Sequence, residues 1–428
     1  MKKNILAASI AALAAAGILS ACGAKTTNTE TTAAPAAQGE SVAASTDGIE
    51  PCEVTFWHAM SNQQEKTLTA LTDQFNAENE YGITVKLVNQ GSYNDLSTKL
   101  TANAAADTLP DLSQAYNNWL NKYIEKVVHL DDFVANDYDN YDDIMESYRK
   151  ETSEFGFINA MPFNKSTYVY FYNKTLFDEM GLAAPETWDD LVSIGEKFKT
   201  EKDLVSLGVD DTSGFLNASL FQDGADYISE EGAQFDNEAG LETMNYIMGL
   251  YNNGYARLVG EDKYFSTPFG NQLVAAYIGS STGASYITHD DFELGVAPLP
   301  GNKEKAANAA GTNIVMFSQD ANKQKAAWEY LKFMTSTAAT TKWAIETGYL
   351  PVRQSAYESE EYQKFMETDP TAKASYAQAA NFFSQKSFDG SYDADQAVKT
   401  KMEEVILNKE DGETALKDLV SAINDTLK

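Results

Sequence analysis

Cysteine and histidine are scarce in this sequence of 428 residues. It contains two cysteines and three histidines. With so few cysteines the chain has no disulfide framework, so its fold must be held together by an apolar core. The isolated histidines His58, His129 and His289 lack the spacing of metal ligands. We therefore expect neither a metal site nor a cofactor.

Positive charge is also in short supply. The chain has 32 Lys and Arg residues against 63 Asp and Glu, a net charge of −31. A protein that binds nucleic acid needs a basic surface that releases counterions, so nucleic acid is excluded as a partner. Bidentate recognition of phosphate usually uses arginine, and the arginines are only Arg149, Arg257 and Arg353.

A long apolar run is found only near the N-terminus. Residues 5–19 are apolar apart from Ser9 and Gly17, and Lys2 and Lys3 precede them. This pattern is typical of a secretory signal. After it, no run approaches the roughly 18 apolar residues that a membrane-spanning helix requires.

The signal ends in Leu19-Ser20-Ala21-Cys22, which resembles the lipobox of bacterial lipoproteins. The resemblance implies that the signal peptide, residues 1–21, is removed and that Cys22, now the first residue, carries lipid on its thiol and amine. Two or more acyl chains, at about 0.8 kcal/mol per buried CH₂, anchor a protein stably to a membrane. The alternative is an ordinary cleaved signal with a chance cysteine. Residues 22–52 are rich in Thr, Ala, Ser and Gly, which predicts a disordered spacer.

From residue 53 onward, strand-like and helix-like segments alternate. The β-prone runs 53–57 and 83–88 are each followed by a helical pattern, with capping-box sequences at Ser61 and at Ser92. This alternation predicts parallel βαβ units and an α/β fold. Ligands in such sheets bind beyond the carboxyl ends of the strands, so we expect the loops at Trp57 and Tyr93 to face a ligand.

Seven short motifs follow one another along the chain. They are Phe56-Trp-His58, Phe75-Asn-Ala-Glu-Asn79, Leu109-Pro-Asp111, Met161-Pro-Phe-Asn164, Tyr172-Asn-Lys174, Pro185-Glu-Thr-Trp-Asp-Asp-Leu191 and Gly348-Tyr-Leu-Pro-Val-Arg353. In this order the chain resembles the extracellular solute-binding proteins of ABC importers, and among them the sugar and glycerol-3-phosphate-binding group (family 1).

The resemblance implies a two-lobed α/β fold, like that of periplasmic binding proteins, with a hinge and a ligand cleft between the lobes. Lobe 1 would hold residues 53–165 and 312–345, and lobe 2 residues 166–311 and 346–428. The lobes would close around a solute. The protein would be a monomer on the extracytoplasmic face of the cell membrane that delivers a carbohydrate to the transmembrane subunits of a permease, without catalysis.

Site residues carry over from the relatives one position at a time. The positions that match ligand-contacting residues of the glycerol-3-phosphate-binding relatives are Tyr93, Ser166, Ser280, Gly311 and Tyr349. Asn117 stands where these relatives have an acidic residue, and Asp395 lies near the place of their phosphate-gripping arginine. A carboxylate repels phosphate and accepts hydrogen bonds from hydroxyls. We therefore expect a neutral sugar or oligosaccharide, with glycerol-3-phosphate or a glycerophosphodiester as the alternative.

Several aromatic residues have two interpretations. Trp57 either faces the cleft or packs at a strand end, and His58 either touches the ligand or only orients its loop. Phe215 matches a region where relatives carry cleft aromatics, although core packing is the preferred interpretation. By contrast, the helical spacing of Trp188, Trp328 and Trp343 among apolar residues indicates core positions.

Two other classes of protein remain open. A surface glycosidase needs only two carboxylates roughly 5–10 Å apart, and no sequence pattern singles out such a pair among the many acids. An adhesin or scaffold lipoprotein would have no need of the seven motifs.

Overall fold

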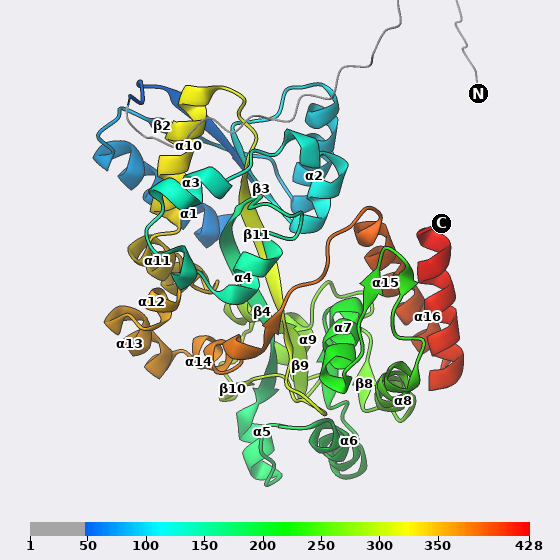
Figure 1. Cartoon of the computed structure of the whole chain (residues 1–428). Helices are drawn as coiled ribbons and strands as arrows, with labels where there is room; N and C mark the ends of the chain where they lie inside the picture. The colour runs from blue at the N-terminus through cyan, green and yellow to red at the C-terminus, as the bar shows by residue number, and fades with distance from the viewer. Residues whose placement is uncertain (1–47) are drawn as a thin grey trace, which may run out of the picture. The chain divides into compact units, whose positions relative to one another are not determined.

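A computed structural model of the chain describes residues 48–428 (Figure 1). The predicted signal peptide, Cys22 and most of the predicted spacer lie outside the described residues.

The strands are β1 (Glu53–His58), β2 (Thr84–Asn89), β3 (Leu112–Ala115), β4 (Met161–Asn173), β5 (Leu207–Val209), β6 (Ile228–Ser229), β7 (Gly232–Ala233), β8 (Ala256–Arg257), β9 (Ala276–Ser280), β10 (Leu294–Ala297), β11 (Ala307–Met316) and β12 (Phe382–Phe383). The helices are α1 (Asn62–Glu78), α2 (Tyr93–Ala105), α3 (Asp131–Asp137), α4 (Glu146–Glu151), α5 (Lys174–Glu179), α6 (Trp188–Lys202), α7 (Thr212–Asp223), α8 (Glu238–Asn252), α9 (Ser266–Gly270), α10 (Ala321–Met334), α11 (Thr337–Thr347), α12 (Gln354–Tyr357), α13 (Glu360–Thr368), α14 (Pro370–Ala377), α15 (Ser391–Asn408) and α16 (Gly412–Thr426).

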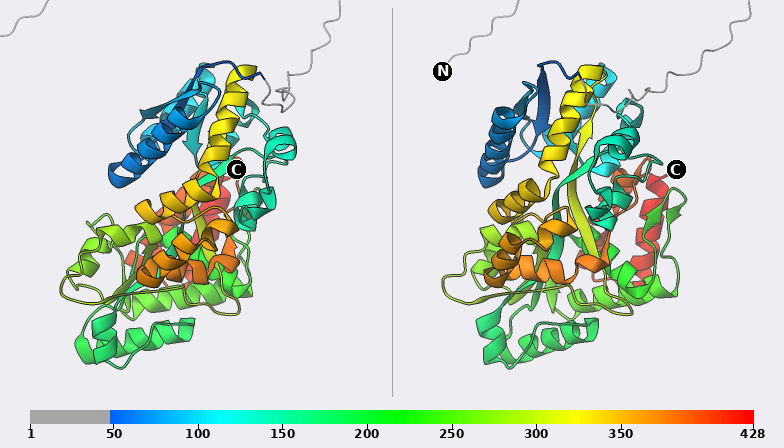
Figure 2. Two further views of the ribbon diagram at one scale, coloured as in Figure 1. Left: turned by 90° about the vertical axis from the view of Figure 1, so that its left-hand side faces the viewer. Right: turned by 60° about the vertical axis from the view of Figure 1, so that its left-hand side comes forward.

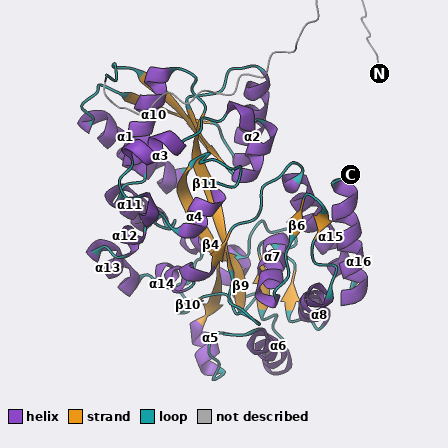
Figure 3. Ribbon diagram, in the orientation of Figure 1, coloured by secondary structure: helices purple, strands orange, loops and turns teal. Residues whose placement is uncertain are grey.

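One sheet runs through most of the described chain, in the order β2-β1-β3-β11-β4-β9-β5-β8. At one end β1 pairs in parallel with β2 and β3, and at the other β5 pairs in parallel with β8 and β9. This confirms the α/β fold and the parallel βαβ units predicted from the alternation. The two long strands β4 and β11 are antiparallel to each other and join these two ends (Figure 3).

Two large apolar cores lie on either side of the β4–β11 pair in the sheet order. The first draws its buried residues from 54–163 and 314–343, where α1 and α10 pack beside β1 (Figure 2). The second draws on 170–307 and 388–423, where α7, α8, α15 and α16 pack together (Figure 1). The lobe boundaries given above stay predictions.

The predicted helix caps have mixed outcomes. Ser92 forms the capping box of α2 with Asp95, as predicted. The capping box at Ser61 is wrong, because the Ser61 side chain makes no capping hydrogen bond. Asn62, the first residue of α1, has a left-handed φ of 51°, so the first turn departs from the helical geometry that a cap requires.

Gly311 allows β4 and β11 to stay paired through an irregularity. The register of the two strands shifts between Gly311 and Asn313, and Gly311 has a φ of 110°. A Cβ at this position would lie 2.0 Å from the Asn164 carbonyl oxygen. Only glycine fits there without moving one strand away from the other.

Gly311→Ala is expected to lower the free energy of unfolding by about 2–4 kcal/mol, because it adds a backbone clash to an unfavourable φ. Urea denaturation measures this change. The matched control is Gly249→Ala in α8, where an added Cβ meets nothing within 4 Å and should stabilise by about 0.5–1 kcal/mol. Equal stability of Gly311→Ala and the unmodified protein would contradict this account of the strand pair.

Candidate functional site

A cavity of about 150 Å³ lies beside the junction of β4 and β11. Its walls come from segments far apart in the sequence. They are Tyr116 to Asn118, Glu151, Tyr168, Asp211 with Ser213 and Gly214, Asn308 to Gly311, Ser384 to Ser387, and Asp395. Three of the predicted site residues, Asn117, Gly311 and Asp395, therefore line one cavity, to which both ends of the sheet contribute.

Two carboxylates share one wall of this cavity. Asp211 lies at the N-terminus of α7 and accepts hydrogen bonds from the Tyr168 hydroxyl (2.7 Å) and the Ser213 hydroxyl (2.9 Å). Asp395, in the first turns of α15, accepts a hydrogen bond from the Tyr227 hydroxyl (3.0 Å). The two tyrosines hold both carboxylates in place by donating to them.

The electrostatics of this wall favour protons on the neighbouring groups. Burial, together with the negative charge of Asp211, raises the pKa of Asp395 to about 6. Burial and the adjacent carboxylates raise the pKa of Tyr168 and of Tyr227 well above the usual value. Both phenols therefore remain protonated donors at neutral pH.

Asn117 is occupied by protein contacts. Its Nδ2 atom donates to the Glu151 carbonyl (2.9 Å), the Glu154 carboxylate (3.2 Å) and the Ser387 hydroxyl (3.3 Å). Its Oδ1 atom accepts from Asn159 (2.8 Å). With its donors and acceptor engaged, Asn117 fixes the wall of the cavity by joining the segment before α15 to the segment after α4.

An aromatic wall continues from Tyr116, on the cavity, to Tyr349. The ring of Tyr93 lies 5.4 Å from that of Tyr116, and Tyr116 lies 5.0 Å from Trp119. The hydroxyls of Tyr93 and Tyr349 lie close enough for each to shift the pKa of the other. Tyr93 also accepts a hydrogen bond from Asn164 (2.9 Å). These rings form a semi-rigid apolar surface with polar tips, a surface that suits sugar rings.

A buried network of polar side chains contacts this aromatic wall through the hydrogen bond from Asn164 to Tyr93. Gln114 on β3 donates to Asn164 on β4 (3.2 Å) and to Thr312 on β11 (3.1 Å). Thr312 donates in turn to Asn164, and Gln114 accepts from the Ala59 amide (2.8 Å). The network links three strands to the loop after β1, so it fixes the orientation of the Tyr93 hydroxyl.

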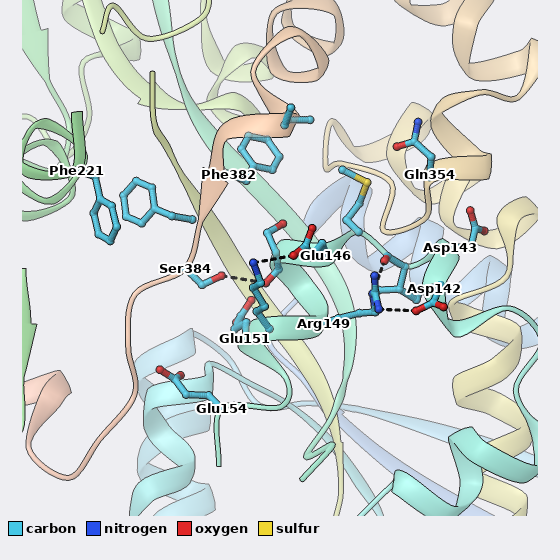
Figure 4. Close-up of a pocket in the computed structure, with 17 residues that line it drawn as sticks. Asp142, Asp143, Glu146, Arg149, Glu151, Glu154, Phe221, Gln354, Phe382 and Ser384 are labelled. Carbon is cyan, nitrogen blue, oxygen red and sulfur yellow. Dashed lines mark hydrogen bonds and ion pairs between the residues drawn. The ribbon is translucent and has the colours of Figure 1, made fainter. Parts of the chain in front are cut away.

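Two other cavities are lined by residues outside β4 and β11. One, of about 670 Å³, shares Glu151 and Ser384 with the site, and its outer wall carries Arg149 turned toward Asp142 at 2.6 Å (Figure 4). The other, of about 750 Å³, is lined by Tyr349 and by the segment that follows β9. Tyr349 is therefore placed on a different cavity from Asn117, Gly311 and Asp395.

Residues 48–428 contain neither a membrane-spanning helix nor a cluster of metal-binding side chains. No helix in this range has the length and apolar character of a membrane span. No group of three or more His, Cys, Asp or Glu side chains in the same range is placed to hold a metal ion.

Comparison with known proteins identifies the family. Residues 70–397, more than half of the chain, match the model for bacterial extracellular solute-binding proteins. The chain belongs to this family. The sn-glycerol-3-phosphate-binding periplasmic protein UgpB of Escherichia coli (strain K12) is 26% identical over 361 residues, covering 77% of this chain and 80% of UgpB.

Solved structures confirm the two-lobed fold of this solute-binding protein. The cyclic α-maltosyl-1,6-maltose binding protein from Arthrobacter globiformis has a TM-score of 0.79 at 24% identity, covering 88% of this chain and 99% of the other. UgpB from Mycobacterium tuberculosis, solved with glycerophosphocholine, has a TM-score of 0.76 at 20% identity, covering 88% and 98%. At these identities the likeness shows the fold alone.

The remaining predicted site residues of the solute-binding protein lie outside the three cavities. Ser166 is buried on β4 opposite Ala310, and the Ser280 hydroxyl lies 3.0 Å from that of Thr282. Trp57 packs against the apolar cluster around α2. Their contact with a solute stays a prediction.

The side chains of His58 and Phe215 are both buried in contact with other parts of the protein. His58 is buried, its Nδ1 atom accepts from the Met60 amide (3.3 Å), and burial lowers its pKa, so the ring is neutral. Phe215 is buried in the second core, 6.4 Å from the ring of Tyr246. Trp188, Trp328 and Trp343 are buried as predicted.

Sequence reasoning missed Tyr116, Tyr168 and Asp211 as parts of the site. One available signal was Asp210-Asp211 between the end of a short strand and the start of a helix, the place where ligands bind in such sheets. No local signal marks Tyr168, because it lies within a strand rich in aromatic residues.

The raised pKa of Asp395 predicts how stability depends on pH. The folded protein binds the Asp395 proton more tightly than the unfolded chain, whose pKa is near 3.8, so the free energy of unfolding falls as pH rises from about 4 to 6. The share from this carboxyl is about 2–3 kcal/mol. Asp395→Asn should remove that share, as measured by urea denaturation across pH.

The control for this experiment is Asp393→Asn, an exposed carboxyl on the same helix, which should leave the pH dependence unchanged. A pH dependence of Asp395→Asn equal to that of the unmodified protein would show that Asp395 is not desolvated.

Proposed function

We propose that this solute-binding protein captures a carbohydrate and delivers it to the transmembrane subunits of an ABC permease. The single observation that carries the proposal is the cavity beside the β4–β11 pair. It combines carboxylates, amides and hydroxyls with an adjoining wall of tyrosine rings. Hydroxyl groups of a sugar need such polar partners, because each one buried without a partner costs roughly 1–3 kcal/mol.

The arginines of the chain argue against a phosphate ester. Arg149 pairs with Asp142 and Arg353 with Asp143 (3.1 Å), while Arg257 donates to the Leu258 carbonyl. None of the three lines the cavity. Asp395, by contrast, would repel a phosphate group.

The competing ligand is glycerol-3-phosphate or a glycerophosphodiester. It is favoured by the names of relatives such as the Escherichia coli protein and by the ligand of the Mycobacterium tuberculosis structure. Calorimetric titration with neutral oligosaccharides and with both phosphate esters separates the two. We expect binding of at least one oligosaccharide and none of the esters, and tight binding of an ester alone would overturn the choice of ligand.

Catalysis is the remaining alternative, because two carboxylates without an ion-pair partner among the described residues, Asp211 and Asp395, line the cavity. We propose that the protein only binds its ligand. Incubation with the bound oligosaccharide, followed by chromatography, should return the sugar unchanged. Turnover that is lost in Asp211→Asn would establish a glycosidase instead.

Lipid anchoring at Cys22 is part of the proposal. It is supported by the sequence around Cys22 and by the extracellular family. Cys22→Ala should move the protein from washed membranes to the soluble fraction, because the acyl chains are lost. The control, Cys52→Ala, should stay on the membrane. Retention of Cys22→Ala on membranes would refute the anchor.

The tyrosine wall gives a direct test of the binding site. Tyr116→Leu should weaken oligosaccharide binding by about 1–3 kcal/mol in calorimetry, because the loss of an aromatic anchor removes its stacking surface. Tyr116→Phe keeps the ring and serves as the matched control with near-normal affinity. Unchanged affinity of Tyr116→Leu would remove Tyr116 from the site.

A further inference from the structure

The cavity presents more hydrogen-bond acceptors than donors. Each carboxylate has about four acceptor positions, and the described residues supply two donors to Asp211 and two to Asp395. The amide oxygens of Asn118 and Asn308, two further residues on the cavity, accept no hydrogen bond in the described part of the chain. A ligand that fills this cavity must therefore bring donors.

The negative charge of the cavity also lacks a partner. Glu151 is neutralised by Lys165 at 2.6 Å, with both side chains buried. Neither Asp211 nor Asp395 forms an ion pair with any lysine, arginine or histidine among residues 48–428. Lys386 borders the cavity but is exposed. Charges removed from water are normally paired, and Asp211 and Asp395 are both half-buried, so they favour a positive group on the ligand.

We propose that the solute is an amino sugar, with its protonated amine bound between Asp211 and Asp395. An ammonium group supplies a positive charge and three N–H donors, which match the unpaired charge and the unfilled acceptors together. A quaternary ammonium supplies the charge without the donors, and a neutral sugar supplies donors without the charge. The inference rests on the proposed carbohydrate-binding function and names the class of carbohydrate.

The pH dependence of binding follows from the groups around the cavity. Asp211, Asp395, Glu151 and Glu154 face or border it, with Lys386 as the exposed cation. Because Asp395 has a pKa of about 6 in the free protein, an amine that binds at lower pH must displace a proton. Affinity for an amino sugar is therefore expected to fall between about pH 7 and 5, while affinity for a neutral sugar changes little.

Matched sugars provide the test. The full mature chain is titrated by calorimetry at about pH 7, where Asp395 is largely ionised, with glucosamine and glucose, galactosamine and galactose, and β-1,4-linked trimers of glucosamine, N-acetylglucosamine and glucose. Within at least one pair the amine is expected to bind about tenfold tighter or more than its neutral counterpart. In Asp211→Asn and Asp395→Asn this advantage should fall below about threefold, whereas the exposed control Asp393→Asn should keep it.

The outcomes separate this inference from the proposed function. Equal or tighter binding of the neutral sugars would overturn the inference that the solute is an amino sugar, but the proposed function of carbohydrate binding would stand. An amine advantage that survives in both asparagine variants places the amine elsewhere and also overturns the inference. Absence of binding to every sugar overturns both. Thermal unfolding of each variant checks that a loss of affinity is not a loss of fold.

Discussion

The antiparallel pairing of β4 with β11 is the constraint on which the rest of the structure depends. These strands join the parallel ends of one sheet, and the two large cores lie to either side of them. The irregularity at Gly311 brings the backbone of β11 against Asn164. The cavity is lined by residues on both strands and from both ends of the sheet, so its dimensions follow from this one pairing.

The second organising feature is the contrast between charge that is neutralised and charge that is not. Beside the strand pair, Lys165 and Glu151 form a fully buried ion pair, supported by Asn313 at 3.1 Å. On the same cavity, Asp211 and Asp395 have only neutral donors. Removal of one partner from a buried ion pair is strongly destabilising. The pair formed by Lys165 and Glu151 is therefore part of the fold and is not free to bind a ligand. In the proposal above, Asp211 and Asp395 bind the ligand.

The fold was predictable from the sequence because its signals are local and repeated. Alternating β-prone and helical segments gave the parallel units, and Ser92 with Asp95 gave the start of α2. The predicted capping box at Ser61 is wrong because Asn62 has a left-handed φ, which prevents the helical first turn that the side-chain pattern favours. Buried tryptophans at helical spacing were predictable for the same reason as the helices themselves.

The site was predictable only in part because its residues meet through tertiary structure. Asn117, Gly311 and Asp395 were predicted from positions that align with site residues of the family, although Asn117 and Asp395 depart from its residue types, and all three line the cavity. Tyr168 and Asp211 are brought together by the packing of α7 against the sheet, which no local pattern reveals. Phe215 matches cleft aromatics of relatives, yet it is buried in the core, in agreement with the preferred interpretation of its sequence.

The most direct test of the central claim is native mass spectrometry of the protein purified without refolding, with identification of the small molecule that it releases. The account predicts a carbohydrate that is free of phosphate and chemically intact, and a released phosphate ester or a cleaved sugar would contradict it.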